Sequence, residues 1–181
     1  EISEWAQARV VSVLTAVLLV TFVIRLIGVE GHSMMPTLQD GDRLLVLNSA
    51  LCGGYRRGDI VVLRKESFLP EPIVKRVIAT EGQVVDIDFF SGAVFVDGHQ
   101  LDEDYVNEPT FLEEGMEFPL TVPKGSIFIM GDNRNASNDS RDVRLGAVDA
   151  RYVIGKAVFL AFPGPDAVTE ERIYGRIGEI A

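Results

Sequence analysis

The sequence predicts a mainly β protein, in which an antiparallel, barrel-like β-domain follows one N-terminal transmembrane helix. Short runs rich in β-branched residues alternate with turns of Gly, Asp and Pro, which is typical of antiparallel sheets. Helical character is confined to the N-terminus, where fifteen consecutive residues carry no charge. A chain of 181 residues is long enough to bury the core of such a domain.

The uncharged run, VVSVLTAVLLVTFVI, covers residues 10–24. Continuing past Arg25 to Val29 gives the roughly 20 residues that cross a hydrocarbon core, and an arginine near a helix end can reach the headgroups. A buried core helix would show an apolar stripe, whereas this run is apolar on every face. A cleavable leader would need small residues in place of Ile27 and Val29. We therefore expect an uncleaved membrane span over about residues 10–29.

The chain is expected to have three parts: an N-terminal segment with the span (1–29), a β-rich domain (30–165) and a C-terminal tail (166–181). Strands are predicted at 43–47, 59–63, 73–80, 83–88, 126–130 and 152–162. The pair Asp97-Gly98 predicts a two-residue hairpin turn within 93–101. The acidic stretch 102–119 is interpreted as a surface excursion.

The charge of the chain argues against a nucleic-acid-binding protein. Seventeen basic residues against 27 acidic ones give a formal charge of -10, the wrong sign for following a phosphate backbone. The single cysteine, Cys52, cannot form a disulfide within the chain. Only His32 and His99 accompany it, and no cluster has the spacing of metal ligands. We therefore expect neither a cofactor nor a metal.

A candidate nucleophile, Ser33, lies directly after the apolar run, in the stretch Gly31-His32-Ser33-Met34-Met35-Pro36-Thr37-Leu38. A serine hydroxyl attacks efficiently only when a neighbouring group accepts its proton. His32 is adjacent in the chain, and adjacent side chains in extended structure point apart. His99 follows a hairpin turn, where an exposed position is the simpler interpretation. A lysine remains, provided that burial makes it neutral near pH 7.

Lys75 lies in the predicted strand Ile73-Val74-Lys75-Arg76-Val77-Ile78, whose alternation places Ile73, Lys75 and Val77 on one face. Two β-branched neighbours on that face provide the apolar environment that lowers the pKa of a lysine. The pattern alone does not say which face is buried. Chemistry favours Lys75 over Arg76 as a base, because a guanidinium is not deprotonated in a protein. Arg76 is better suited to pair with a carboxylate.

Four motifs occur in order along the chain. They are Gly31-x-Ser33-Met34-x-Pro36-Thr37-Leu38, then Gly58-Asp59-Ile60-Val61, then Lys75-Arg76-Val77-Ile78 with Glu81-Gly82, and last Gly131-Asp132-Asn133-Arg134-x-x-Ser137-x-Asp139-Ser140-Arg141-x-x-x-x-Gly146. Together they resemble the motifs of bacterial type I signal peptidases, the membrane-bound Ser/Lys proteases that remove secretory signal peptides. The resemblance covers the N-terminal run and most of residues 29–163, and it is closer to the compact, single-span members.

The resemblance implies that Ser33 is the nucleophile and Lys75 the general base, and that the Ser137 hydroxyl holds the lysine amine. The backbone N–H of Ser33 would bind the oxyanion. Some members add a serine hydroxyl two residues before the nucleophile, where this chain has Gly31. The glycine-bearing branch of the family is active without it.

The resemblance also implies two ion pairs that support the site. Asp132 would pair with Arg76, and Asp139 with Arg141. The neighbouring Ser140 is interpreted as structural.

Cleavage after a small-x-small sequence, commonly Ala-x-Ala, is a further implication of the resemblance. The substrate would bind extended, pairing with strand edges near Ser33 and Lys75. Shallow apolar pockets would exclude larger side chains. By position, the candidates for the pocket walls are Val29, Met34, Leu38, Ile73 and Val74, although apolar residues are also typical of a core.

The expected partners are the signal peptides of exported preproteins and the lipid bilayer, without nucleic acid or metal. The expected location is the plasma membrane, crossed once, with the catalytic domain on the extracytoplasmic side. Tethering would confine the search for a substrate that is itself in the bilayer. The aromatic residues Phe89, Phe90 and Phe111 either touch lipid or are buried.

Two alternatives stay open. A specialised relative, such as a conjugation, spore-related or organelle inner-membrane peptidase, would use the same chemistry on another client. A membrane-anchored module that binds signal peptides without cleaving them would be indifferent to Ser33→Ala or Lys75→Ala, whereas an enzyme would lose turnover. Self-cleaving SOS repressors share the Ser/Lys chemistry, but they carry a DNA-binding domain where this chain has an apolar run.

Overall fold

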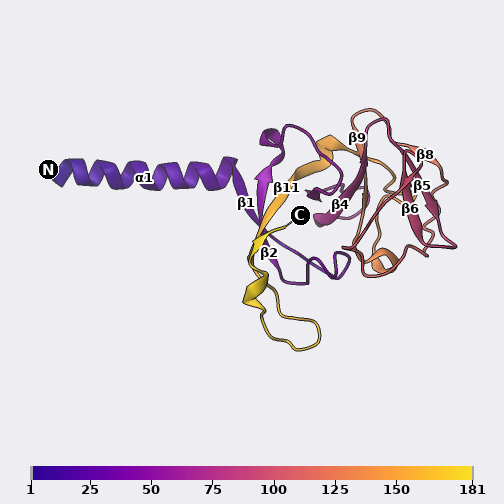
Figure 1. Ribbon diagram of the computed structural model, residues 1–181. Coiled ribbons are helices and arrows are strands. Elements are labelled where there is room, and N and C mark those ends of the chain that lie inside the picture. Colours follow the sequence, from indigo (N-terminus) through magenta and orange to yellow (C-terminus); the bar gives the residue numbers. More distant parts are fainter. Residues whose placement is uncertain (1, 181) are drawn as a thin grey trace.

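The computed structural model describes residues 2–180, and the side chains of all of these except 2, 3, 19 and 20. One α-helix, α1 (Ile2–Phe22), projects as a rod from a domain of β-strands (Figure 1). Every strand pair in this described range is antiparallel, which confirms the predicted β class. Glu1 and Ala181, the ends of two predicted segments, lie outside the described residues.

The strands form a large and a small sheet. The large sheet has eight strands in the order β1-β2-β11-β3-β4-β9-β10, with β12 paired to β11. They are β1 (Ile24–Gly28), β2 (Arg43–Asn48), β3 (Ile60–Leu63), β4 (Ile73–Thr80), β9 (Ser126–Met130), β10 (Val148–Asp149), β11 (Val153–Phe162) and β12 (Gly178–Glu179). The small sheet has four strands in the order β7-β6-β5-β8. They are β5 (Val84–Asp88), β6 (Ala93–Val96), β7 (His99–Gln100) and β8 (Leu120–Thr121).

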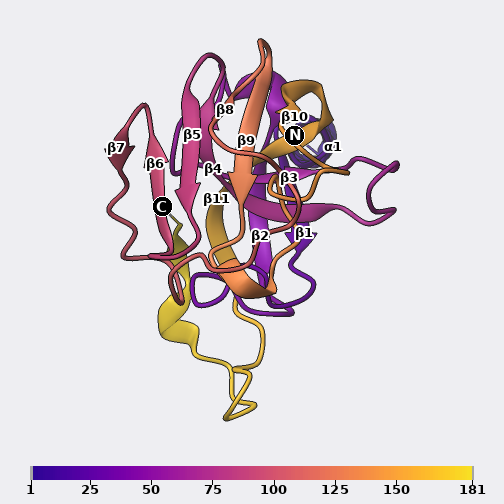
Figure 2. The ribbon, with the colours of Figure 1, turned by 90° about the vertical axis from the view of Figure 1, so that its right-hand side faces the viewer.

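Short 3₁₀ helices connect some of these strands. They are η1 (Ser49–Leu51), η2 (Arg134–Ala136), η3 (Ala150–Tyr152) and η4 (Tyr174–Arg176). The small sheet lies at the end of the domain remote from α1, next to β4 and β9 (Figures 1 and 2).

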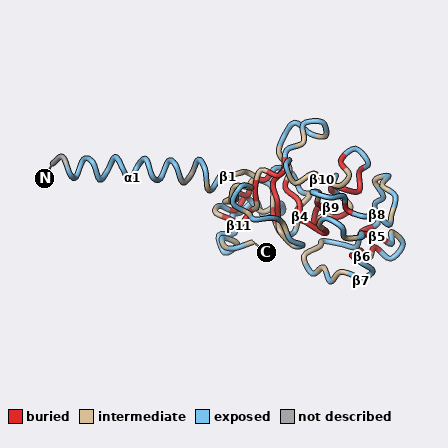
Figure 3. The backbone as a smooth tube through the Cα atoms, turned by 90° about the horizontal axis from the view of Figure 1, so that it is seen from above, coloured by how far each residue is buried: buried red, intermediate tan, exposed pale blue. Residues whose placement is uncertain are grey.

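The central strands are covered on both faces, because the large sheet curls and the small sheet closes one end. The first core cluster packs Val62 and Val74 against Met34, from the loop that precedes β2. The second packs Val61 and Val77 on the opposite side, and the third lies between β4, β9 and the small sheet. All of β3 and six consecutive residues of β4 are therefore buried. Figure 3 shows this buried centre and the contrasting exposure of α1.

The structure contradicts a continuous helical span over residues 10–29. The helix ends at Phe22, and Ile24–Gly28 forms β1, paired with β2 from Ile24↔Leu47 to Gly28↔Arg43. Pairing supplies hydrogen-bond partners for this backbone, and β-branched residues favour a strand. No helix within residues 2–180 is long and apolar enough to cross a membrane.

The hairpin predicted at Asp97-Gly98 is confirmed. It joins β6 to β7, and both turn residues have positive φ, 53° and 77°, as a type I′ turn requires. The segment after residue 165 returns to the domain: Gly178 and Glu179 pair with β11, and Arg176 donates to both carboxylate oxygens of the buried Asp42 at 3.0 and 2.7 Å. The tail is therefore part of the packed structure.

The three aromatic residues considered for lipid contact have different surroundings. Phe89 is half-buried and packs against Phe118, with 5.9 Å between ring centroids. Phe90 is 96% exposed and Phe111 50% exposed.

Candidate active site

Ser33 lies in the Ser33 loop, which we define as residues 29–42, between β1 and β2. The Val29 N–H donates to the Asp42 carbonyl at 2.8 Å, which closes the two ends of the loop. Met34, next to the serine, is 1% exposed in the first core cluster. The loop is thus held by backbone hydrogen bonds at its base and by an apolar anchor beside the hydroxyl.

The Lys75 side chain reaches Ser33 from β4. Its amine donates to the serine hydroxyl, with 2.5 Å between Nζ and Oγ. Lys75 is 3% exposed, and this burial lowers the pKa of its ammonium to about 8. Asp139 and Glu114 oppose the shift by favouring the charged form, whereas Arg141 favours the neutral form. An amine that loses its proton near neutral pH therefore lies in contact with a serine hydroxyl.

Arg76, the next residue of β4, is 2% exposed. Its Nε and Nη2 donate to the two carboxylate oxygens of Asp132 at 2.9 and 2.8 Å, and its Nη1 donates to the Gly58 carbonyl at 3.1 Å. The guanidinium lies over the Tyr105 ring, 4.0 Å from its centroid. The Thr37 hydroxyl also donates to Asp132, at 2.5 Å. The sequence-predicted pair thus joins β4 to the segment that begins at Gly131, and Thr37 connects it to the Ser33 loop.

Asp139 and Arg141 form the second predicted pair, in the C-terminal box, which we define as residues 131–146. Both side chains are fully buried, and the Arg141 Nε and Nη2 donate to the two Asp139 oxygens at 2.9 Å each. The Ser137 hydroxyl donates to Asp139 at 2.9 Å. Within residues 2–180 no hydrogen bond joins Ser137 to Lys75, so the expected role of Ser137 in holding the amine stays a prediction.

Gly131 permits the close approach of the C-terminal box to the Ser33 loop. A side chain at this position would collide with the Ser33 carbonyl and with the Ser137 side chain. Its own N–H donates to Asp139 at 2.9 Å. The box therefore crosses directly behind the candidate nucleophile.

The five candidate pocket-wall residues lie in or next to the core. Four of them, Val29, Met34, Leu38 and Val74, belong to the first core cluster, and Ile73 is half-buried against the second. Their contact with a substrate stays a prediction.

A groove of about 430 Å³ lies between two strand edges. In the described part of the chain, β1 has no strand on its outer side, and Ile73–Lys75 of β4 pairs only with β3, because the β9 pairing starts at Arg76. The groove is lined from β1 by Leu26, Ile27 and Gly28, and from the approach to β4 by Glu71 and Pro72. Two unpaired edges beside one groove are suited to an extended peptide.

Sequence reasoning gave no role to Asn133, which ties the box to the Ser33 loop. Its N–H donates to the Ser33 carbonyl at 3.0 Å, and its side-chain amide donates to the His32 carbonyl at 3.1 Å. Its place inside the fourth motif was the only available indication. Ser140, expected to be structural, accepts the Ile129 N–H at 3.0 Å through its hydroxyl and donates its own N–H to the Ile129 carbonyl at 3.0 Å.

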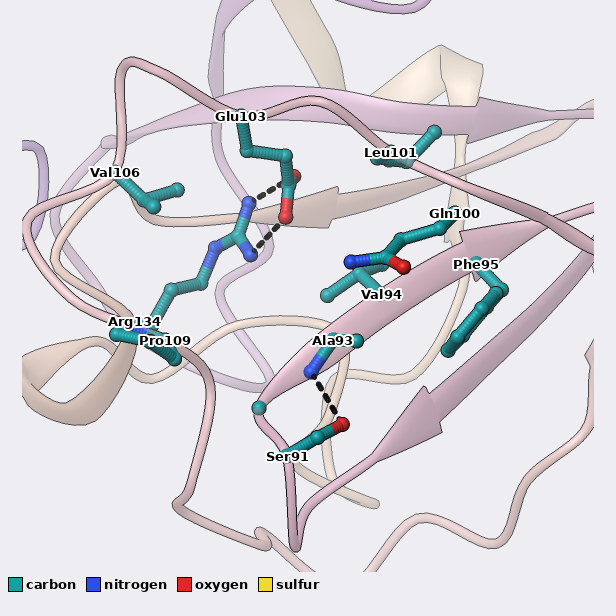
Figure 4. A pocket seen from close by; sticks show the side chains of 11 residues that line it. Ser91, Ala93, Val94, Phe95, Gln100, Leu101, Glu103, Val106, Pro109 and Arg134 are labelled. Atoms are coloured by element: carbon teal, nitrogen blue, oxygen red, sulfur yellow. Dashed lines mark hydrogen bonds and ion pairs between the residues drawn. The ribbon is translucent and has the colours of Figure 1, made fainter.

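Arg134, also unassigned, links the C-terminal box to the acidic stretch 102–119. It donates to the two Glu103 carboxylate oxygens at 2.8 and 2.5 Å, and to the Thr110 hydroxyl at 3.0 Å. Figure 4 shows this pair in the wall of a cavity of about 320 Å³ beside β6. The acidic stretch is therefore attached to the site through a buried ion pair.

Within residues 2–180, no group of three or more His, Cys, Asp or Glu side chains is placed to hold a metal ion. The expected independence from metal stays a prediction.

Comparison with known proteins identifies the family. Residues 2–162 match the family described as signal peptidase, peptidase S26. The chain belongs to this family. The match spans α1, the Ser33 loop, β4 and the C-terminal box.

Curated relatives carry the same family name. A signal peptidase I from Bacillus licheniformis is 36% identical over 168 residues, covering 88% of each chain. Signal peptidase I T of Bacillus subtilis (strain 168) is 36% identical over 168 residues, covering 88% of this chain and 85% of the relative. A probable signal peptidase I-1 from Synechocystis sp. is 37% identical over 171 residues, covering 90% and 83%.

A solved structure is also similar to this chain. A crystal structure of a signal peptidase I from Enterococcus faecalis V583 is 30% identical, covers 57% of this chain and 96% of that chain, and superposes with a TM-score of 0.47. Membership of the family makes the chain a serine endopeptidase of the signal peptidase I type.

Breaking the buried Arg76–Asp132 pair should strongly destabilise the fold. Asp132→Ala leaves a guanidinium that is 2% exposed without its carboxylate, and we expect a loss of about 3–5 kcal/mol in the free energy of unfolding. Urea denaturation followed by circular dichroism measures it. The matched control is Asp149→Ala, whose partner Arg151 is 89% exposed and for which we expect a much smaller loss. Equal losses in the two variants would contradict a structural role for the buried pair.

Proposed function

We propose that this signal peptidase cleaves exported preproteins after a small-x-small sequence such as Ala-x-Ala, with Ser33 as the nucleophile and Lys75 as the general base. The observation that carries the proposal is the 2.5 Å contact between Nζ and Oγ in a buried setting. Burial supplies what the chemistry needs, because it favours the neutral amine that can accept the serine proton.

The reaction then runs through an acyl-enzyme. Neutral Lys75 takes the proton of the Ser33 hydroxyl as Oγ attacks the carbonyl carbon of the residue before the cut. The resulting ammonium gives that proton to the leaving amine, the peptide C–N bond breaks, and the mature protein is released. A water molecule, deprotonated by the same amine, attacks the ester and frees the signal peptide together with the Ser33 hydroxyl.

The backbone N–H of Ser33 is the proposed oxyanion donor. Among the described residues it has no hydrogen-bond acceptor, so it is available to a substrate oxygen. Gly31 offers no side-chain donor, and its own N–H is taken by the Asp40 carboxylate at 2.7 Å. The position two residues before the nucleophile therefore contributes backbone geometry, with a φ of 83° that favours glycine.

The groove between β1 and the start of β4 is the proposed binding site for the signal peptide. An extended peptide there could pair its backbone with the free edge of Ile24–Gly28 on one side and of Ile73–Lys75 on the other. Its scissile bond would then lie near Lys75, at the end of one edge. Small side chains would point at the apolar surface around Val29, Met34, Leu38, Ile73 and Val74.

The helix α1 is the proposed site of contact with a lipid bilayer. Its described apolar side chains are exposed, with Leu14, Val17 and Phe22 at 56%, 55% and 63%. An apolar surface of this extent is costly in water and favourable in lipid. Association through α1 would hold the groove close to a membrane in which the apolar part of a signal peptide lies.

Cleavage should need both members of the dyad. Wild type, Ser33→Ala and Lys75→Ala are incubated in detergent with a preprotein ending in Ala-x-Ala, and product masses are read by mass spectrometry. We expect cuts after the second Ala by wild type and a loss of at least about 10³-fold in kcat/KM for each variant, since triad-type residues act as a unit.

Ser67→Ala and Lys124→Ala, at exposed positions, serve as matched controls and should cleave like wild type. Binding of the preprotein by wild type without cleavage would favour the alternative of a binding module. Normal cleavage by Lys75→Ala would mean that another group is the base.

The rate should rise with pH, because Lys75 acts as a base only after losing its proton. Its lowered pKa of about 8 places the half-maximal kcat/KM near pH 8, with a fall of about tenfold per pH unit well below that value. Initial rates on a fluorogenic signal-peptide substrate between pH 5 and 10 measure the profile. Full activity at pH 5 would exclude a neutral lysine as the base.

Binding to lipid should depend on the apolar surface of α1. We expect the chain to float with phosphatidylcholine–phosphatidylglycerol vesicles, and the double variant Val13→Asp/Val17→Asp to stay at the bottom of the gradient, because each carboxylate costs about 2.5–3.5 kcal/mol in hydrocarbon. Val168→Asp, at a position 90% exposed in the tail, is the matched control and should float. Flotation of all three proteins would assign lipid contact to another surface.

A further inference from the structure

Glu114 lies in the acidic stretch, alongside the C-terminal box. The stretch is attached there by backbone contacts: the Met116 N–H donates to the Arg141 carbonyl at 3.0 Å, and the Arg141 Nη1 donates to the Leu112 carbonyl at 3.0 Å. Gly115 forms an isolated antiparallel bridge with Asp142. Glu114 therefore faces the box from a segment that the sequence assigned to the surface.

The Glu114 carboxylate points into the box. Its side chain is 9% exposed, and Oε2 accepts the Asp139 N–H at 3.3 Å. The same oxygen lies 3.9 Å from the Arg141 Nε, whose direct partner is Asp139 at 2.9 Å. Glu114 is thus a buried carboxylate held next to an ion pair that is already complete.

Charge pairing around the box is complete for four arginines. Each donates to two oxygens of one carboxylate, in the pairs Arg76–Asp132, Arg134–Glu103, Arg141–Asp139 and Arg144–Asp142. Among the described residues, Lys75 and Glu114 have no such two-oxygen pairing, and the Lys65 amine donates only to the Arg144 and Leu145 carbonyls, at 3.4 and 2.9 Å. When Lys75 is neutral, the cation nearest to Glu114 is Arg141 at 3.9 Å, which already pairs with Asp139, so the Glu114 charge is only partly compensated.

The charge of Glu114 acts on the titration of Lys75. Burial raises the pKa of Glu114 to about 6, and Asp139 and Asp142 add to this increase while Arg141 opposes it. The Glu114 charge in turn raises the pKa of Lys75, as do those of Asp139 and Asp132. Coupled groups titrate as a pair, so the proton on one sets the affinity of the other.

We propose that Glu114 is a positioning residue that sets the pH range in which Lys75 becomes a base, by placing a titratable negative charge beside the Asp139–Arg141 pair. The proposal rests on the proposed function of Lys75. Above about pH 6, the negative charge of ionised Glu114 stabilises the protonated form of Lys75. Fewer molecules then carry the neutral amine, and the cleavage rate is lower. Below that pH, Glu114 is protonated and no longer stabilises the ammonium form of Lys75. The fraction of neutral Lys75 therefore falls less steeply than it would if Glu114 stayed ionised.

Glu114→Gln tests the proposal, because the amide oxygen can still accept the Asp139 N–H while the charge is absent. We expect the half-maximal kcat/KM to move down by about half a pH unit, a gain of about threefold near pH 7. Plateau rates above pH 9 should agree within about twofold. Below pH 6 the two profiles should converge, because wild-type Glu114 is then neutral as well. Glu113→Gln, an exposed neighbour with the same charge change, should follow wild type throughout.

A measurement independent of cleavage separates this proposal from the proposed function. The chain has four lysines, at 65, 75, 124 and 156, so the ¹³Cε resonance of Lys75 can be assigned by its absence in Lys75→Met. Its titration midpoint should be lower in Glu114→Gln than in wild type and in Glu113→Gln. An unchanged midpoint overturns the proposal whether or not the protein cleaves. If the midpoint is lower in Glu114→Gln but none of the proteins, wild type included, cleaves the substrate, the coupling between Glu114 and Lys75 is supported and the Ser33–Lys75 dyad is overturned.

Impaired folding of Glu114→Gln would call for the reciprocal measurement. In wild type, a glutamate ¹³Cδ resonance should titrate near pH 6. In Lys75→Met its midpoint should rise, because the cation that favours ionised Glu114 is gone. An unchanged midpoint there would equally overturn the proposal.

Discussion

The contact between the Lys75 amine and the Ser33 hydroxyl depends on keeping a lysine out of water. A charged amine at 3% exposure loses most of its hydration, and among the described residues its hydrogen-bond partner is a neutral hydroxyl. The neutral amine is therefore favoured more than it would be at a surface. Both faces of β4 have to be covered for this to happen, so the burial of Lys75 depends on the curled sheet, the small sheet and the Ser33 loop together.

The arginine–carboxylate pairs give this arrangement its geometry. Arg76 and Asp132 connect β4 with the C-terminal box, and Arg141 with Asp139 holds the box in the conformation that passes behind the serine. Buried pairs of this kind contribute little net stability compared with apolar packing, but removing one partner is costly. They act here as fixed connections between segments far apart in the sequence, and within residues 2–180 neither pair is hydrogen-bonded to the Lys75 amine.

Much of the fold followed from local patterns. Alternating β-branched runs and glycine-containing turns predicted the antiparallel strands, and Asp97-Gly98 predicted a turn whose φ values are both positive. The end of the N-terminal helix did not follow from such patterns. Hydropathy treats Ile24–Gly28 as a continuation of the apolar run, whereas the backbone of these residues pairs with β2, some twenty positions later in the chain. Composition does not report a pairing partner that is distant in sequence.

The sequence by itself determined the chemistry that is possible. It supplied one serine in a motif, a lysine rather than an arginine as the group able to act as a base, and two ion pairs whose members stand in the motifs. Only the tertiary structure decided that both faces of β4 are buried, that Asn133 holds the Ser33 loop, and that Glu114 faces the box. Burial and charge coupling depend on the distance between segments that are remote in the chain. These segments come close together only when the sheet has curled and the acidic stretch has packed against the domain.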